Sequence, residues 1–213
     1  MSLILNLFAI KNSAPQNIET NFAEYAKSTK GFLKESTELP DEYGVHMTTL
    51  GNNTVCLFTS YAQYDIDEIA RYLSQSLNTT TLSLGIYEGT MWFYNLYKNG
   101  CEEDCFSTSP SQCLREGENV KKYKGNAKKF SSIWGGLNEK NIEKYFFNHE
   151  KLLNKRKRNK KAYPQDSCEA WDGWQMVDFM EKLGIAYPFS EDTTDTKDKF
   201  FAFENKMSHK NLE

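Results

Sequence analysis

The chain of 213 residues is long enough to bury one sizeable core, and its 39% hydrophobic and 14% aromatic residues exclude a disordered chain. Its formal net charge of −3 is too small to indicate a nucleic-acid or membrane partner from the whole molecule. The apolar run of residues 3–10 is interrupted by Asn6 and has no basic residue ahead of it. We therefore expect neither a signal peptide nor a membrane span, but a single soluble domain (residues 1–213) in the cytoplasm.

Residues 1–40 are predicted to form an N-terminal extension that contains one helix. The segment 18–27 follows a break at Pro15 and carries apolar residues at the spacing of an amphipathic helix. Pro40 and Asp41 then predict a turn into the main body of the chain.

Residues 41–107 are predicted to form the core of the sheet. Segments 45–50 and 54–60 are rich in β-branched and aromatic residues and flank a Gly-Asn-Asn loop, so they predict a β-hairpin. Asp65 and Glu68 have the spacing of a capping box at the start of a helix. Apolar residues at helical spacing follow, and they predict one face of this helix packed on the sheet.

Three further strands are predicted at 81–87, 91–98 and 101–107. Asn99 and Gly100 favour a two-residue type I′ turn between the last two, because both residues tolerate positive φ. Such a turn sets the register between these strands. The predicted facing pairs are Lys98 with Cys101, Tyr94 with Cys105, and Phe93 with Phe106.

The rest of the chain is predicted to be loop and helix. Residues 108–125 are rich in Ser, Pro, Gln and Gly and predict a long loop, and residues 126–188 predict several helices. One of these begins after Asn138 and includes His149, and another begins with a capping box of Asp172 and Gln175. Residues 189–213 predict a polar tail. The fold class is therefore α+β, with a mainly antiparallel sheet in β-β-α-β-β-β order packed by several C-terminal helices.

The five cysteines predict no metal site and no disulfide. An odd number of cysteines in a chain without an export signal favours reduced thiols. Cys101 and Cys105 loosely suggest a metal-binding knuckle with Cys113, but on one strand they would lie about 13 Å apart at roughly 3.3 Å per residue. On the same strand Glu102 and Asp104 are expected to point to one face, while Glu103 points to the other.

No recognisable reaction chemistry emerges from the other residues. His46, His149 and His209 have no carboxylate or thiol at a telling spacing, and the sequence contains no phosphate loop, nucleophile elbow or dinucleotide fingerprint. We therefore predict no catalytic, metal-binding or cofactor-binding residue. A cysteine–histidine pair, or another hydrolase site assembled in space, stays open as an alternative.

Two segments could contact a partner. The first is basic: residues 151–161 hold seven basic and no acidic residues, leaving 19 basic and 29 acidic residues in the rest of the chain. Six of these cations could bind nucleic acid or another anion, namely Lys155, Arg156, Lys157, Arg158, Lys160 and Lys161. The favoured interpretation is a solvated helix end, since no aromatic residues are interleaved for base stacking.

The second segment is the aromatic strand 91–97, which is apolar on both faces. Core packing is its expected role. If one face stayed open, Trp92, Tyr94 and Tyr97 would form a partner-binding surface, because Trp and Tyr often anchor interfaces.

Two stretches resemble a family of uncharacterised bacterial proteins. They are the strand and turn 92–100 (WFYNLYKNG), followed by Asp104 and Phe106, and the helix 172–185 (DGWQMVDFMEKLGI), followed by Tyr187 and Pro188. The resemblance covers residues 45–188, except that the family's aromatic-bearing Pro segment is replaced by residues 107–113. It implies a bacterial, cytoplasmic α+β protein and transfers no site residues.

The function predicted from sequence is a non-enzymatic module that binds a protein partner, as an immunity-like or regulatory factor. This follows from the absence of a reaction motif together with the supply of Trp and Tyr. Contact with nucleic acid through residues 155–161 and a hydrolase with an unrecognised site are the alternatives.

Overall fold

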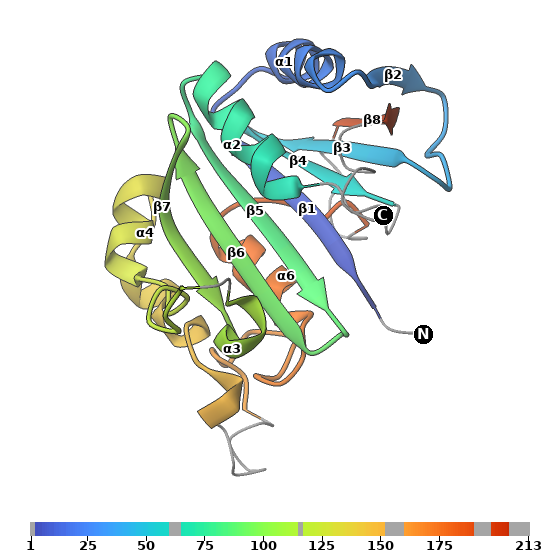
Figure 1. Cartoon of the computed structure of the whole chain (residues 1–213). Coiled ribbons are helices and arrows are strands. Elements are labelled where there is room, and N and C mark those ends of the chain that lie inside the picture. Colours follow the sequence, from blue (N-terminus) through green and yellow to red (C-terminus); the bar gives the residue numbers. More distant parts are fainter. Residues whose placement is uncertain (1–2, 60–64, 115–116, 152–159, 190–196, 205–213) are drawn as a thin grey trace.

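An eight-stranded antiparallel sheet organises the computed structural model, which describes residues 3–59, 65–114, 117–151, 160–189 and 197–204 (Figure 1). The strand order is β2-β8-β3-β4-β1-β5-β6-β7. The strands are β1 (Leu5–Lys11), β2 (Phe32–Ser36), β3 (Gly44–Leu50), β4 (Asn53–Phe58), β5 (Thr80–Tyr87), β6 (Met91–Lys98), β7 (Cys101–Ser107) and β8 (Lys197–Glu204). The α+β class and the mainly antiparallel sheet are thus confirmed.

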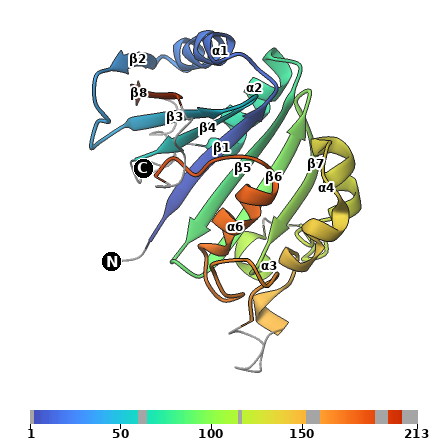
Figure 2. The same ribbon diagram turned by 180° about the vertical axis from the view of Figure 1, so that it is seen from behind.

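The α-helices lie on both faces of this sheet, and three short 3₁₀ helices follow α4 in the chain (Figures 1 and 2). The α-helices are α1 (Pro15–Ser28), α2 (Ile66–Ser76), α3 (Pro110–Cys113), α4 (Ala127–Trp134) and α6 (Gln175–Lys182), and the 3₁₀ helices are η1 (Glu139–Asn141), η2 (Glu143–Tyr145) and η3 (His149–Lys151).

The centre of the sheet consists of two interleaved β-α-β units. β1 pairs antiparallel with both β4 and β5, and β4 also pairs antiparallel with β3. Consequently β1 and β3, joined through α1, run parallel with β4 between them, and β4 and β5, joined by α2, run parallel with β1 between them. This is the split β-α-β arrangement of ferredoxin-like folds. β6 and β7 widen it on one side, and β8 and β2 on the other.

Helices α1 and α2 cover one face of the sheet. Phe22 of α1 packs against Phe8, Phe58 and Phe203, with ring centroids 4.9–6.2 Å apart. Helix α2 begins at Asp65, whose carboxylate accepts a hydrogen bond from the backbone N–H of Glu68 at 2.9 Å. The predicted cap is therefore present.

Helices α4 and α6 cover the opposite face, as Figure 2 shows from behind. Their core gathers the alternate residues of β6, namely Trp92, Tyr94 and Leu96, against Phe130 and Phe179. The rings of Tyr94 and Phe179 stack with centroids 5.8 Å apart. Lys11 fixes the end of α4, because its ammonium donates to the backbone carbonyls of Trp134 and Gly135.

Both chain ends contribute strands to the sheet, so it extends beyond the predicted 41–107. β1 lies in its middle, and β8 inserts between β2 and β3. Phe201 and Phe203 of β8 are buried, although both fall in the segment predicted as a polar tail. The predicted helix in the N-terminal segment is confirmed, and it starts at Pro15.

A bulge in β7 corrects the predicted register. Lys98 does face Cys101, but Tyr94 faces Phe106, and Phe93 faces Ser107. The ladder shifts between Leu96 and Tyr97, where Asp104 and Glu102 are their respective partners, which leaves Glu103 as the extra residue. A shift of one residue reverses which face the following side chains occupy.

The helices after residue 138 also differ from the prediction. In place of one α-helix after Asn138, the chain forms the separate short 3₁₀ helices. The predicted capping box of α6 is wrong as well, since the N-cap is Trp174 and its backbone N–H donates to the carboxylate of Asp172 at 2.9 Å. Gly184, with φ of 67°, ends α6 as expected.

Candidate functional site

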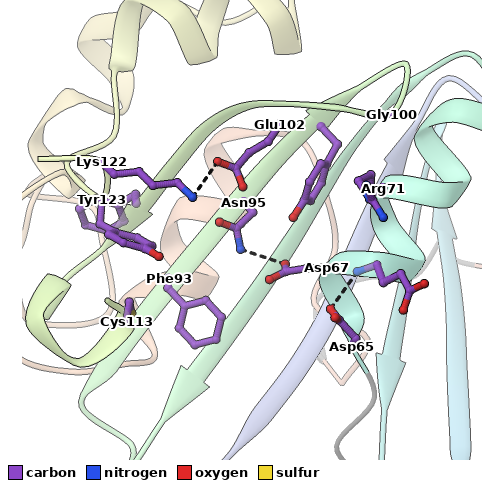
Figure 3. A pocket seen from close by; sticks show the side chains of 13 residues that line it. Asp65, Asp67, Arg71, Phe93, Asn95, Gly100, Glu102, Cys113, Lys122 and Tyr123 are labelled. Atoms are coloured by element: carbon purple, nitrogen blue, oxygen red, sulfur yellow. Dashed lines mark hydrogen bonds and ion pairs between the residues drawn. The ribbon is translucent and has the colours of Figure 1, made fainter. Parts of the chain in front are cut away.

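A cleft of about 530 Å³ lies beside α2, over the part of β6 and β7 that α2 leaves open (Figure 3). The first turns of α2 form one wall, and the loop after β7 forms the other. The residues with polar groups on its surface are Asp65, Asp67, Glu68, Arg71, Asn95, Tyr97, Glu102, Cys113, Lys122 and Tyr123.

Strand alternation and the bulge together select the floor of this cleft. In β6 the even-numbered residues from Trp92 to Leu96 enter the α4 and α6 core, so Phe93, Asn95 and Tyr97 face the cleft. Because of the bulge, Glu102 pairs with Tyr97 and joins the floor, whereas Asp104 points to the opposite face. There Asp104 accepts a hydrogen bond from the hydroxyl of Tyr94 at 2.7 Å. The expectation that Glu102 and Asp104 share a face is therefore wrong.

Asp67 is the carboxylate that the sheet holds in place. The hydroxyl of Ser83 donates to it at 2.5 Å. The amide of Asn95 donates to the same oxygen at 2.9 Å (Figure 3). Burial, and then the charges of Asp67 and Glu102, raise the pKa of Tyr97, so its phenol stays neutral. Both of these donors to Asp67, the hydroxyl of Ser83 and the amide of Asn95, are uncharged.

The α2 wall carries three exposed charged groups. Asp65 caps the helix, and Glu68 and Arg71 follow one after the other on the exposed side of its first two turns. The acidic residues stand at the helix N-terminus, where the backbone dipole favours negative charge.

The opposite wall depends on Lys122. Its ammonium lies 2.9 Å from the carboxylate of Glu118 and 3.2 Å from that of Glu102. These two partners, Glu118 first, raise the pKa of Lys122. Glu118 also accepts a hydrogen bond from the hydroxyl of Tyr123 at 2.5 Å. Since two carboxylates neutralise Lys122, the lining of the cleft has an excess of negative charge.

Among its described lining residues, the cleft offers binding groups but no activated nucleophile. Cys113 is the thiol among the described lining residues, and burial raises its pKa although the nearby hydroxyl of Ser107 partly opposes this. The described lining residues include no histidine to act as its base. Within the described ranges, no group of three or more His, Cys, Asp or Glu could hold a metal ion.

The aromatic residues proposed as a partner surface belong to the two cores. Trp92 and Tyr94 are fully buried between the sheet and α6, and Tyr97 is 4% exposed. The core-packing interpretation therefore describes these rings, and a surface made of them is not available in the folded chain. Only Tyr97 borders the cleft.

The other candidate residues are scattered over the molecule. Lys160 and Lys161 are exposed, while Lys155, Arg156, Lys157 and Arg158 lie outside the described residues. His149 is buried and its ring stacks on Trp171 with centroids 4.7 Å apart. The cysteines are all free, with Cys101 exposed and Cys105 buried.

No sequence pattern identifies the cleft residues as a site. Asp65 and Glu68 predict a helix cap, and Glu102 is one of three neighbouring carboxylates. Lys122 joins Glu102 from 20 residues away, and no local pattern announces that pairing. The one available signal was the alternation of polar Asn95 with apolar neighbours in an otherwise aromatic strand.

Comparisons with known proteins assign no family. No model of a known protein family, no curated protein sequence and no solved structure matches the chain. Among the helices of the described ranges, none has the length and apolarity needed to span a bilayer. The geometry of the cleft therefore carries the functional argument.

Proposed function

We propose that this chain is a non-enzymatic binding module that recognises a basic segment of a partner protein in the cleft beside α2. The observation that carries the proposal is the acidic lining of a concave site in which Asp67 accepts hydrogen bonds from Ser83 and Asn95. Among the described lining residues, the carboxylates outnumber the cations, so a Lys or Arg side chain complements the charge of the cleft. Electrostatic complementarity of this kind favours specificity and fast association.

The floor of the cleft also suits the stem of a basic side chain. The partly exposed ring of Phe93 lies beside Asn95 on the cleft face of β6 and over Gly85, where a Cβ would stand 2.4 Å from the ring. Lys and Arg side chains pack their apolar stems on such rings while the charged head contacts a carboxylate. Gly85 thus makes room for the ring that would support the ligand.

A protein segment fits this cleft better than a metabolite. Sites for small molecules usually enclose most of the ligand surface. Here Glu68, Arg71, Glu102 and Lys122 are exposed, so both walls are open to solvent along the cleft. Charges spread along such walls suit an extended chain with several contacts.

The biological setting that we propose is an immunity-like or regulatory role in the bacterial cytoplasm. Support for the setting comes from the resemblance of residues 92–100 and 172–185 to an uncharacterised bacterial family. Support for the binding role comes from the cleft, which is independent of that resemblance.

Selection of random peptides on immobilised protein tests the proposal without knowledge of the natural partner. Peptides selected on the wild type should be enriched in Lys and Arg. Glu68→Lys replaces an exposed carboxylate of the cleft and should remove this enrichment and weaken a selected peptide at least about tenfold. Glu24→Lys makes the same charge change on the exposed side of α1 and serves as the control.

Two results would contradict the proposal. One is a set of selected peptides without any charge bias. The other is equal binding of the basic peptides to the wild type, Glu68→Lys and Glu24→Lys, because the peptides would then bind elsewhere.

A further inference from the structure

A second hollow, of about 560 Å³, lies beside the cleft. Its lining includes the aromatic rings of Phe106, Tyr123, Phe146 and Phe147, together with Val120 at its margin. Val120 is 40% exposed. The hollow is therefore more apolar than the cleft.

Residues 120–125 border both hollows, since Lys122 lines the cleft, Val120 and Gly125 line the second hollow, and Tyr123 lines both. Their backbone runs along the outer edge of β7, where the N–H of Ser107 donates to the carbonyl of Tyr123 and the N–H of Gly125 donates to that of Cys105, both at 3.0 Å. Phe106 and Tyr123 contribute to the lining on both sides. A bound chain that crosses this segment could thus reach both hollows at once.

Gly125 keeps the second hollow closely lined by rings. It has φ of 65°, and a Cβ at this position would stand 3.2 Å from atoms of both Phe106 and Phe146. Any larger residue would push these rings out of place. The turn therefore lets the loop approach the rings without covering the hollow.

We infer that the second hollow binds a large apolar side chain from the same partner segment that places its basic group in the cleft. This inference rests on the proposed function and adds a second specificity determinant to it. Apolar anchors in preformed pockets supply much of the binding energy of protein interfaces. The charged residues in its lining are Glu143, Glu150 and Lys124, so both hollows have a small excess of negative charge that a basic segment complements.

Two small probes test the inference by nuclear magnetic resonance of the ¹⁵N-labelled full chain. N-acetyl-phenylalaninamide should shift the backbone amides of Gly125 and Ala127, and N-acetyl-argininamide should shift the side-chain amide of Asn95. Val120→Glu should lower the affinity for the phenylalanine probe at least about fivefold and leave the affinity for the arginine probe unchanged. Glu68→Lys should have the opposite pattern.

The outcomes separate the inference from the proposed function. If the phenylalanine probe leaves Gly125 and Ala127 unshifted, or binds Val120→Glu equally well, the inference is overturned while the basic-segment proposal stands. If the arginine probe leaves Asn95 unshifted, the proposed function fails. Both variants lie at exposed positions, so an unchanged spectrum away from the substitution verifies that they fold.

Discussion

The sheet is wider than the helices that cover it, so part of each face is left uncovered. The uncovered surface on the β7 side differs from that on the β8 side. Among the described residues, the core under α4 and α6 takes none from β2, β3 or β8, and the core under α1 and α2 takes only Tyr97 from β6 and β7. The face that α4 and α6 cover is therefore bare at the β8 side of the sheet, and the face that α1 and α2 cover is bare at the β7 side. At the β7 end the polar groups border an open cleft, whereas at the β8 end they are closed over.

The closed end is built around His46. Its Nε2 lies 3.1 Å from both the carboxylate of Asp198 and the hydroxyl of Thr48, and that hydroxyl also donates to Asp198 at 2.7 Å. The rings of Phe200 and Phe189 cover the imidazole, with centroids 4.8 and 5.3 Å away. As a result, His46 is only 4% exposed.

The difference indicates what each set of polar groups does. His46 and Thr48 are buried, although Asp198 is 39% exposed, and buried polar groups are costly to leave without a hydrogen bond, so the closed cluster stabilises the attachment of β8 to β3. Exposed charges contribute little to stability. The charged walls of the cleft therefore gain little for the fold, which is consistent with their proposed use in binding.

The largest expected effect comes from removing Phe203, which lies in the core under α1 and α2, on the face of β8 opposite the closed end. This residue is fully buried, and its ring lies 4.9 Å from Phe22 and 5.8 Å from Phe58. We expect Phe203→Ala to lower the free energy of unfolding by about 3–5 kcal/mol, the usual cost of deleting a buried phenylalanine ring. Urea denaturation of the full chain measures it.

Phe200→Ala is the matched control on the same strand. Phe200 is partly exposed on the other face of β8, so its removal should cost less than that of Phe203. A loss below about 1 kcal/mol for Phe203→Ala would mean that β8 is not part of the cooperative core.

A smaller effect compares the two ends directly. Asp198→Ala removes the partner of both His46 and Thr48, and we expect it to cost about 1–3 kcal/mol because these buried groups lose a hydrogen bond. Glu68→Gln, at the open end, should change the free energy of unfolding by less than about 0.5 kcal/mol. Lys197→Ala, the exposed neighbour of Asp198, controls for changes in strand propensity.

The two measurements can also contradict the distinction between the ends. Equal costs for Asp198→Ala and Glu68→Gln would show that the closed cluster and the open wall contribute alike to stability. The interpretation of the cleft as a surface kept for binding would then lose its energetic support.

Local sequence patterns predict the helix caps and turns that are determined by residues close together in the chain. Asp65 and Glu68 sit at the start of α2 because an N-cap needs only its own first turn. Asn99 and Gly100 both have positive φ, at 51° and 82°, as the two-residue turn requires.

The candidate site could not be predicted in this way, because its causes are not local. The bulge at Glu103 arises in an ordinary run of polar residues, yet it decides that Glu102 faces the cleft and Asp104 the core. Phe201 and Phe203 enter the core by pairing with segments more than 150 residues earlier. Neither a β-bulge nor such long-range pairing leaves a periodic signal.

Another small effect concerns Asp104, which the bulge turns away from the cleft. Burial raises the pKa of this carboxyl, although the hydrogen bonds from Tyr94 and Asn126 oppose the shift. Asp104→Asn keeps an acceptor for both donors, so near pH 7 we expect it to change the free energy of unfolding by less than about 1 kcal/mol. Its effect should appear mainly in the pH dependence of stability.

The direction of this pH dependence follows from how tightly the folded and unfolded chains bind the proton of Asp104. With the pKa raised in the folded state, the folded chain binds the proton more tightly than the unfolded chain, so this group adds stability below the unfolded pKa of about 3.9. That contribution disappears as the pH rises through the folded pKa. The stability of the wild type relative to Asp104→Asn should therefore increase as the pH falls. The difference between their melting temperatures, measured from pH 3 to pH 7, tests this. Tyr94→Phe removes a hydrogen bond that lowers the pKa and should steepen the pH dependence; a constant difference between wild type and Asp104→Asn over this range would mean that Asp104 has the same proton affinity in both states.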